Sequence, residues 1–83
     1  MSAYTVEVRV MPRASLLDPQ GQAVQHALQA LGFADVADVR AGKHLVLRVQ
    51  AATREEAAAK ARTMCDRLLA NPVTEDYECS VSQ

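Results

Sequence analysis

The stretch Tyr4-Thr5-Val6-Glu7-Val8-Arg9-Val10-Met11-Pro12 decides what kind of fold this chain adopts, because its residues alternate between apolar and polar up to Val10. Valines at every second position predict a β-strand with one buried face and one exposed face. Pro12 ends the strand, since proline has no amide hydrogen to donate to a ladder. We therefore expect a sheet that is covered on one face.

A helix is expected after this strand and a short loop. Asp18 is a typical N-cap, and Pro19 suits the first helical position. Gly32 stands where a left-handed residue commonly ends a helix. Between them an apolar stripe recurs at helical spacing, formed by Val24, Ala27, Leu28 and Leu31. The stripe predicts that this helix packs against the sheet.

The second half of the chain repeats this order. Residues 36–41 predict a short strand, Gly42 a tight turn, and residues 44–51 a further strand. Thr53 and Glu56 have capping-box spacing at the start of a second helix, which is expected to run to about Ala70. Its predicted inward residues are Ala57, Ala61, Met64, Cys65 and Leu68. Asn71-Pro72 ends it, and alternation over residues 73–81 predicts a fourth strand.

The predicted order is therefore β-α-β-β-α-β, in a single α+β domain spanning residues 1–83. Two helices on one face of a four-stranded antiparallel sheet give a two-layer, ferredoxin-like sandwich. The other face of the sheet is then open to solvent or to a partner.

Size and charge exclude several classes of protein. A chain of 83 residues and 9.0 kDa exposes about 4,900 Å² when folded, which allows one small core and no second domain. The net charge of −1 argues against a nucleic-acid binder, which normally carries a basic excess. There is neither an apolar run of about 18 residues nor a secretory leader, so we expect a cytoplasmic protein without a membrane span.

The residues themselves indicate no catalytic centre and no metal site. Cys65 and Cys79 lack the spacing of a redox or zinc motif, and we expect two free thiols acting as small apolar residues. His26 and His44 have no partner that spacing can identify. Arg13 follows the first strand, but its loop has no glycine run to bind phosphate, so a solvated side chain or a partner contact is favoured. A binding or assembly subunit is the best interpretation.

Three segments add a resemblance to this interpretation. They are residues 17–21 (LDPQG), residues 39–43 (VRAGK) and residues 65–77 (CDRLLANPVTEDY). In this order and at these distances they resemble the PurS family, the small subunits of bacterial phosphoribosylformylglycinamidine synthase. The similarity covers essentially the whole chain, with departures at Ala41 and Cys79.

The resemblance implies a non-catalytic subunit in purine biosynthesis. Such a subunit forms a homodimer or tetramer and bridges an ATP-dependent amidoligase (PurL) and a glutaminase (PurQ), supporting ammonia transfer between them. No cofactor is implied for this chain, whereas ATP and Mg²⁺ are expected in the amidoligase. The family segments offer polar residues on loops and element ends, and partner contact and structural capping are both open for each of them: Asp18, Gln20, Arg40, Lys43, Asn71, Glu75 and Asp76. The alternatives are a small-molecule-binding regulatory module of the same fold and a small hydrolase.

Overall fold

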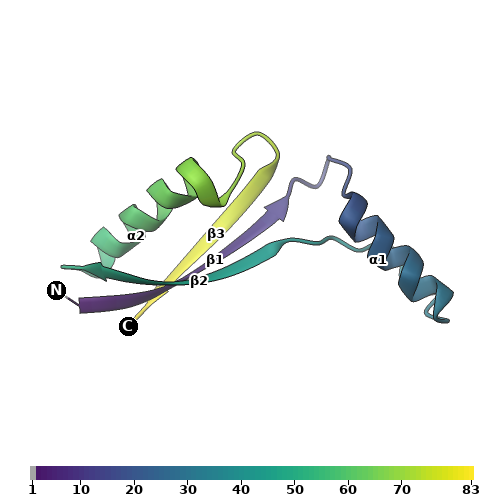
Figure 1. Cartoon of the computed structure of the whole chain (residues 1–83), viewed down its shortest axis with the longest axis horizontal. Coiled ribbons are helices and arrows are strands. Elements are labelled where there is room, and N and C mark those ends of the chain that lie inside the picture. Colours follow the sequence, from purple (N-terminus) through teal and green to yellow (C-terminus); the bar gives the residue numbers. More distant parts are fainter. Residues whose placement is uncertain (1) are drawn as a thin grey trace.

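The computed structural model describes residues 2–83 and contains a small sheet with one helix lying on it and one projecting from its end (Figure 1). The strands are β1 (Ser2–Pro12), β2 (Lys43–Ala51) and β3 (Glu75–Ser82). The helices are α1 (Pro19–Ala30) and α2 (Arg54–Met64), and α2 continues into a π-helical segment, η1 (Cys65–Leu69). The predicted α+β class is confirmed.

The sheet has three strands in the order β2-β1-β3, and both neighbouring pairs are antiparallel. The register places Val8 of β1 opposite Leu45 of β2 and Cys79 of β3. The antiparallel arrangement agrees with the prediction, and the strand predicted over residues 73–81 is present as β3. Within residues 2–83 the sheet has three strands instead of four, because the strand predicted over residues 36–41 does not form.

Helix α2 covers one face of the sheet, and the core lies between them. Val6, Val8 and Val10 are fully buried there, in one cluster with Ala57 and Ala61 of α2. Alanines on the inner side let the helix approach the strands closely. The other face of the sheet is polar and exposed, with an Arg9–Glu78 ion pair at 3.5 Å among its contacts. One covered face is what the alternation in β1 predicts.

The end of the second helix differs from the prediction. Ala70 donates its amide to the carbonyl of Cys65, five residues back, at 3.0 Å. Ala57, Ala61 and Cys65 are buried at steps of four residues, and the wider turn then buries Ala70, five residues after Cys65. Met64 and Leu68, which were predicted to point inward, are instead 38% and 82% exposed. A uniform 3.6-residue period cannot anticipate such a widening.

The predicted strand over residues 36–41 is wrong. This segment is irregular and runs back beside α1 toward the start of β2 (Figure 1). Its carbonyls are engaged by helix side chains: Gln25 donates to Ala37 and Gln29 donates to Val36, both at 3.0 Å. The groups that a strand would offer to a ladder are therefore bound to α1.

The predicted packing of α1 on the sheet is also wrong. The helix and the returning segment together form an arm, residues 19–42, that extends away from the sheet and from α2 (Figure 1). The principal extents are 51 × 25 × 14 Å, and the radius of gyration is 16.3 Å, against about 12 Å for a compact chain of this length. Val24 and Leu31 of the predicted stripe are 42% and 74% exposed. Helix α1 is amphipathic as predicted, but within residues 2–83 no other segment covers Val24 and Leu31 of its apolar stripe.

The predicted helix ends are largely confirmed. Asp18 caps α1, and Gly32 has a φ of 102°. The Phe33 amide bonds back to the carbonyl of Leu28 at 3.0 Å, which completes the C-terminal motif. At α2, Thr53 accepts from the Glu56 amide at 3.1 Å.

Two turns differ in detail from the prediction. Gly42 does not form a hairpin; it lies where the returning segment meets β1, and a Cβ at this position would collide with the carbonyl oxygen of Val10. Residues 71–74 form a turn, so β3 begins at Glu75 and Val73 is 74% exposed. Asn71 shapes this turn by accepting from the Val73 amide at 2.9 Å rather than by a left-handed backbone.

Candidate docking site at one end of the sheet

The strand register gathers the predicted site residues at one end of the sheet. Pro12, the last residue of β1, lies opposite Glu75 at the start of β3, and Lys43 at the start of β2 lies opposite Val10. The base of the arm joins the sheet at this same end. The residues predicted from the three segments all lie here, although they are up to 58 positions apart in sequence (76 minus 18): Asp18, Gln20, Arg40, Lys43, Asn71, Glu75 and Asp76.

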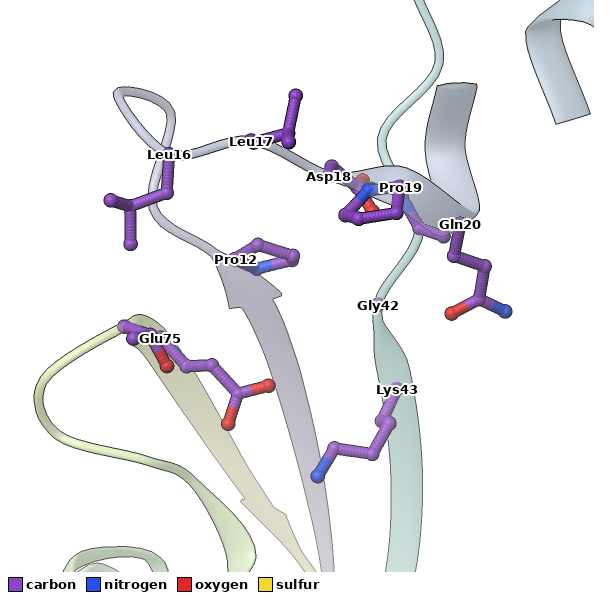
Figure 2. A pocket seen from close by; sticks show the side chains of 11 residues that line it. Pro12, Leu16, Leu17, Asp18, Pro19, Gln20, Gly42, Lys43 and Glu75 are labelled. Carbon is purple, nitrogen blue, oxygen red and sulfur yellow. Dashed lines mark hydrogen bonds between the residues drawn. The ribbon is translucent and has the colours of Figure 1, made fainter. Parts of the chain in front are cut away.

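An open hollow of about 730 Å³ lies between the strand ends and the base of the arm (Figure 2). Its apolar lining comes from Pro12, Leu16, Leu17 and Pro19, and its polar lining from Asp18, Gln20, Lys43 and Glu75. Lys43 and Glu75 extend their side chains into it from the two outer strands (Figure 2). A broad, mixed surface of this kind suits contact with another protein better than enclosure of a substrate.

Asp18 ties the two ends of the arm together. Its Oδ1 accepts from the Gly21 amide at 3.0 Å, and its Oδ2 accepts from the Ala41 amide at 2.8 Å. The Ala41 and Gly21 amides, together with the nearby Arg40 guanidinium, hold the pKa of Asp18 below its usual value. Structural capping is therefore established for this residue, and its side chain is only 9% exposed.

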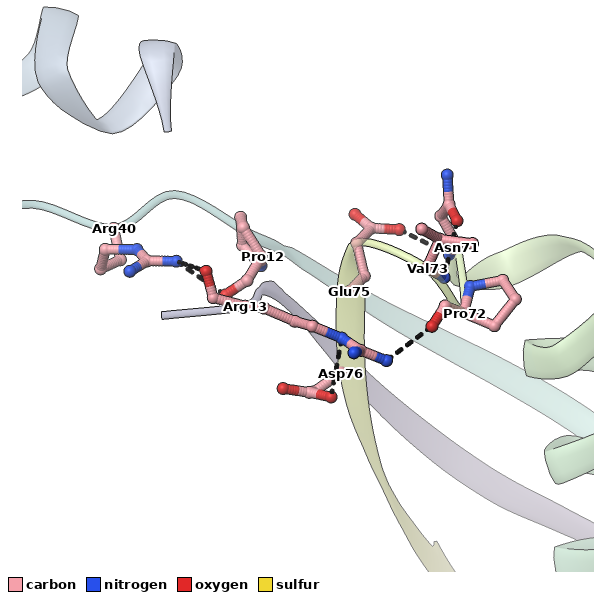
Figure 3. A network of polar contacts seen from close by, with 8 residues as sticks. All are labelled: Pro12, Arg13, Arg40, Asn71, Pro72, Val73, Glu75 and Asp76. Atoms are coloured by element: carbon pink, nitrogen blue, oxygen red, sulfur yellow. Dashed lines mark hydrogen bonds and ion pairs between the residues drawn. The ribbon is translucent and has the colours of Figure 1, made fainter. Parts of the chain in front are cut away.

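Arg40 holds the end of β1 and the loop that follows it. Its guanidinium donates to the carbonyls of Pro12 and Arg13, each at 2.7 Å (Figure 3), and to that of Ala14 at 3.1 Å. Three carbonyls at a strand end are thereby satisfied by one side chain. The Arg40 side chain is 25% exposed, so most of its surface contacts this chain and little of it is open to a partner.

Arg13 joins the loop after β1 to the turn before β3. It donates to the Pro72 carbonyl at 2.6 Å, and its Nε lies 3.6 Å from a carboxylate oxygen of Asp76 (Figure 3). The sequence favoured a solvated side chain or a partner contact for Arg13. The side chain is 46% exposed, and it also makes contacts within the chain that the sequence did not predict, Asp76 among them.

The turn before β3 is stiffened by two further bonds. Glu75 accepts from the Asn71 amide at 2.7 Å, in addition to the bond from Val73 to the Asn71 side chain (Figure 3). Lys43 is exposed, and its Nζ donates to the Leu69 carbonyl at 3.2 Å. These bonds hold the polar side chains on a backbone that is fixed before any partner arrives.

Sequence reasoning missed the apolar part of this surface. Leu16 and Leu17 are 41% and 71% exposed beside the hollow. Their sequence signal is two consecutive leucines in a loop between a strand and a helix, where exposed apolar side chains are costly unless something covers them.

Within residues 2–83, no three His, Cys, Asp or Glu side chains converge as metal ligands. Over the same residues, none of the helices has the length and apolarity that crossing a bilayer requires.

Comparison with known families gives one consistent result. Residues 5–83 match the family described as PurS, phosphoribosylformylglycinamidine (FGAM) synthase. Subunit PurS of that synthase from Bacillus subtilis is 44% identical over 80 residues, covering 96% of this chain and 94% of the relative. The Synechocystis PurS subunit is 45% identical over 75 residues, covering 90% and 75% respectively.

Solved structures agree with the fold described above. The B. subtilis PurS structure superposes with a TM-score of 0.88 at 44% identity, covering 96% of this chain and 99% of that chain. A chain of PurLQS from Thermotoga maritima superposes with a TM-score of 0.89 at 31% identity, covering 98% and 99%. The projecting arm is part of these superpositions, because they include nearly every residue.

Proposed function

This chain belongs to the PurS family of phosphoribosylformylglycinamidine synthase, and from that premise we propose that it is the synthase's non-catalytic small subunit. In this role it acts in purine biosynthesis in the cytoplasm and joins the amidoligase subunit PurL to the glutaminase subunit PurQ. The observation that carries the bridging role is the gathering of all seven family-segment residues at one end of the sheet, beside an open hollow.

The chemistry of the reaction explains why a bridging subunit is useful. A glutaminase releases ammonia, and an amidoligase uses ammonia as a nucleophile. Ammonia that escapes into water at neutral pH becomes protonated and loses its nucleophilic lone pair. A subunit that holds both catalytic partners in register therefore supports the reaction without contributing a catalytic group.

The end of the sheet where these seven residues lie, called the docking end below, has features suited to holding two partners in register. The bonds from Asp18, Arg40 and Arg13 fix the backbone of the loop, the arm and the turn relative to one another. On this fixed frame Lys43 and Gln20 are exposed next to Leu16 and Leu17. Apolar anchors beside charged groups on a rigid backbone give both affinity and specificity.

The shape of the chain supports self-association as a homodimer or tetramer. Its exposed area is 5725 Å², compared with about 4,900 Å² for a typical monomer of this mass. The arm contributes apolar surface to this area, because its stripe faces solvent at Val24 and Leu31. A second copy or a catalytic partner would remove this surface from water.

No cofactor is proposed for this chain. The ATP that the ligation consumes and the Mg²⁺ that accompanies it are assigned to the amidoligase partner.

Reconstitution of the synthase tests the proposal. Glutamine-dependent synthesis is measured with the amidoligase and glutaminase alone and again after adding this chain, and we expect synthesis to depend on the addition. Synthesis from ammonium salts should depend on it much less, because free ammonia does not need to pass between subunits. Equal glutamine-dependent rates with and without the chain would refute the bridging role. Hydrolysis catalysed by this chain alone would favour the alternative that it is a small hydrolase. Saturable binding of a small molecule would favour the alternative that it is a regulatory module.

A further inference from the structure

Two thiols that are distant in sequence meet beneath the second helix. Cys65 begins η1 and Cys79 lies in β3, and their Sγ atoms are 3.8 Å apart. Both are free thiols. The register explains the meeting, because Cys79 lies opposite Val8 on the covered face of the sheet and Cys65 continues the buried line of α2.

The two thiols differ in their access to solvent. Cys65 is fully buried, whereas Cys79 is only partly buried. Burial, together with the neighbouring thiol of Cys79, raises the pKa of Cys65 to about 11. A reagent from solution therefore reaches Cys79 first, and Cys65 is placed to react with whatever forms there.

We propose that Cys65 and Cys79 form a reversible dithiol–disulfide pair that exchanges with low-molecular-weight disulfides such as oxidised glutathione. In the first step the Cys79 thiolate attacks one glutathione sulfur, forming a mixed disulfide and releasing one glutathione thiolate. In the second step Cys65 loses its proton to solvent and attacks the Cys79 sulfur, which releases the second glutathione thiolate. Two protein thiols are oxidised to one disulfide, and one glutathione disulfide is reduced to two thiols.

The local geometry permits this bond. The sulfurs must approach from 3.8 Å to about 2.05 Å. A hollow of about 250 Å³ borders the Cys65 side of the pair and is lined also by Asp66, Ala70 and Tyr77. Cys65 is packed in the core, but its neighbours on the same helical face, Ala61 and Ala70, have small side chains, so a small shift of its sulfur displaces few atoms.

The bond would close a loop that contains part of the docking end. Asn71 and Glu75 lie between the two cysteines in sequence. Oxidation would therefore restrict the turn that carries them and alter partner binding, a consequence that rests on the proposed function. The thiol chemistry itself needs no partner.

Intact-mass measurement of the folded full-length chain tests the pair. The chain is equilibrated with mixtures of reduced and oxidised glutathione in a mildly alkaline buffer, and its remaining thiols are then alkylated. We expect a monomeric product that has lost two hydrogens and takes up no alkyl group, and dithiothreitol should reverse it. Because the bond closes a loop of 15 residues (79 minus 65, plus one), the melting temperature should rise by about 5 °C or more.

Single variants test the order of the steps. In Cys65→Ala, Cys79 should retain one glutathionyl group, because nothing displaces it. In Cys79→Ala, Cys65 should remain reduced while the chain is folded. Equal glutathionylation of the two variants would overturn the assigned order. A wild-type chain that stays fully alkylatable, forms only disulfides between chains, or melts earlier after oxidation would overturn the pair, and none of these results depends on the variants.

A separate assembly measurement distinguishes this proposal from the proposed function. Oxidised and reduced chains are compared for binding to the amidoligase. A disulfide that forms without changing binding would overturn the link to docking but leave the thiol chemistry standing. Failure of both forms to bind would count against the docking role alone.

Discussion

Asp18 Oδ2 lies 3.7 Å from the Nε of Arg40 while it accepts the amide of Ala41 at 2.8 Å. The residue that starts α1 is thus bound to the residues that lead into β2, more than 20 positions later. Arg40 in turn binds the carbonyls at the end of β1. These contacts fix the base of the arm to the sheet, and they make Asp18 and Arg40 structural in the isolated chain.

The first prediction concerns the Asp18 carboxylate. The pKa of Asp18 is lower in the folded chain than in the unfolded one. At pH values between the folded and the unfolded pKa, the unfolded chain therefore binds more protons, and stability rises with pH. The stabilisation is complete above the unfolded pKa of about 4 and is lost as the pH falls through the folded value. Asp18→Asn should unfold at lower urea concentration than the wild type at pH about 7, and the difference should shrink below pH about 3.

Glu55→Gln is the matched control, since it removes a carboxylate from the exposed first turn of α2. This variant should differ little from the wild type at either pH. If Asp18→Asn lowers the urea concentration of unfolding as much below pH about 3 as at pH about 7, the charge of Asp18 contributes nothing to stability.

The second prediction separates Arg40 from Lys43. Arg40→Ala leaves three carbonyls at the end of β1 without their donor, so it should lower the free energy of unfolding by about 2–3 kcal/mol. Lys43→Glu changes an exposed side chain and should cost no more than about 1 kcal/mol, yet it should weaken binding to the amidoligase. Thermal melts and co-elution with that subunit provide the two measurements.

Arg40→Lys is the informative companion variant, because it keeps the charge but not the planar fork that binds several carbonyls. It should be nearly as unstable as Arg40→Ala. A stable Arg40→Ala chain that fails to bind the amidoligase would instead assign Arg40 to partner contact.

The sequence predicted those parts of the fold that depend on local pattern. The period-two alternation in β1, the Asp18-Pro19 start of α1 and the Thr53 cap of α2 each depend on neighbouring residues, and the structure has all of them. The docking residues were predicted because their segments resemble a family. Their meeting at one end of the sheet follows from the antiparallel register, which pattern analysis does not provide.

The errors arose where distant contacts override local pattern. The apolar stripe of α1 implies a covered face, but it does not say whether the cover comes from this sheet or from another chain. Residues 36–41 have weak alternation, and Gln25 and Gln29 bind their carbonyls instead of a strand. Nothing in the spacing of Cys65 and Cys79 predicts that their sulfur atoms meet.

The third prediction concerns Gly42. A Cβ here would collide with the Val10 carbonyl oxygen and the Met11 sulfur, and the backbone atom cannot move without disturbing the pairing of β1 with β2. Gly42→Ala should therefore lower the free energy of unfolding by about 1–3 kcal/mol, measured by urea titration.

Gly32→Asn is the comparison, because nothing lies within 4 Å of a Cβ at Gly32 and asparagine tolerates the left-handed backbone found there. Gly32→Asn should lower the free energy of unfolding by less than Gly42→Ala does. A loss at Gly42→Ala no larger than that at Gly32→Asn would contradict the close approach at position 42, where the backbone φ is not positive.

The last prediction concerns the arm. Because Leu31 is 74% exposed in this chain, the isolated protein should hide it by self-association, and light scattering at micromolar concentration should give at least twice 9.0 kDa. Leu31→Glu should lower this mass, since a charge buried at an interface without a partner is strongly unfavourable. Its melting curve should keep the cooperative transition of the sheet, because Leu31 lies outside the core.

Val46→Glu is the matched control, because Val46 is 63% exposed on the face of the sheet that α2 does not cover. This variant should leave the mass unchanged. If Val46→Glu dissociates the oligomer and Leu31→Glu does not, self-association uses the face of the sheet, and the arm is left for the catalytic partners. A wild-type chain that scatters as a monomer would contradict self-association altogether.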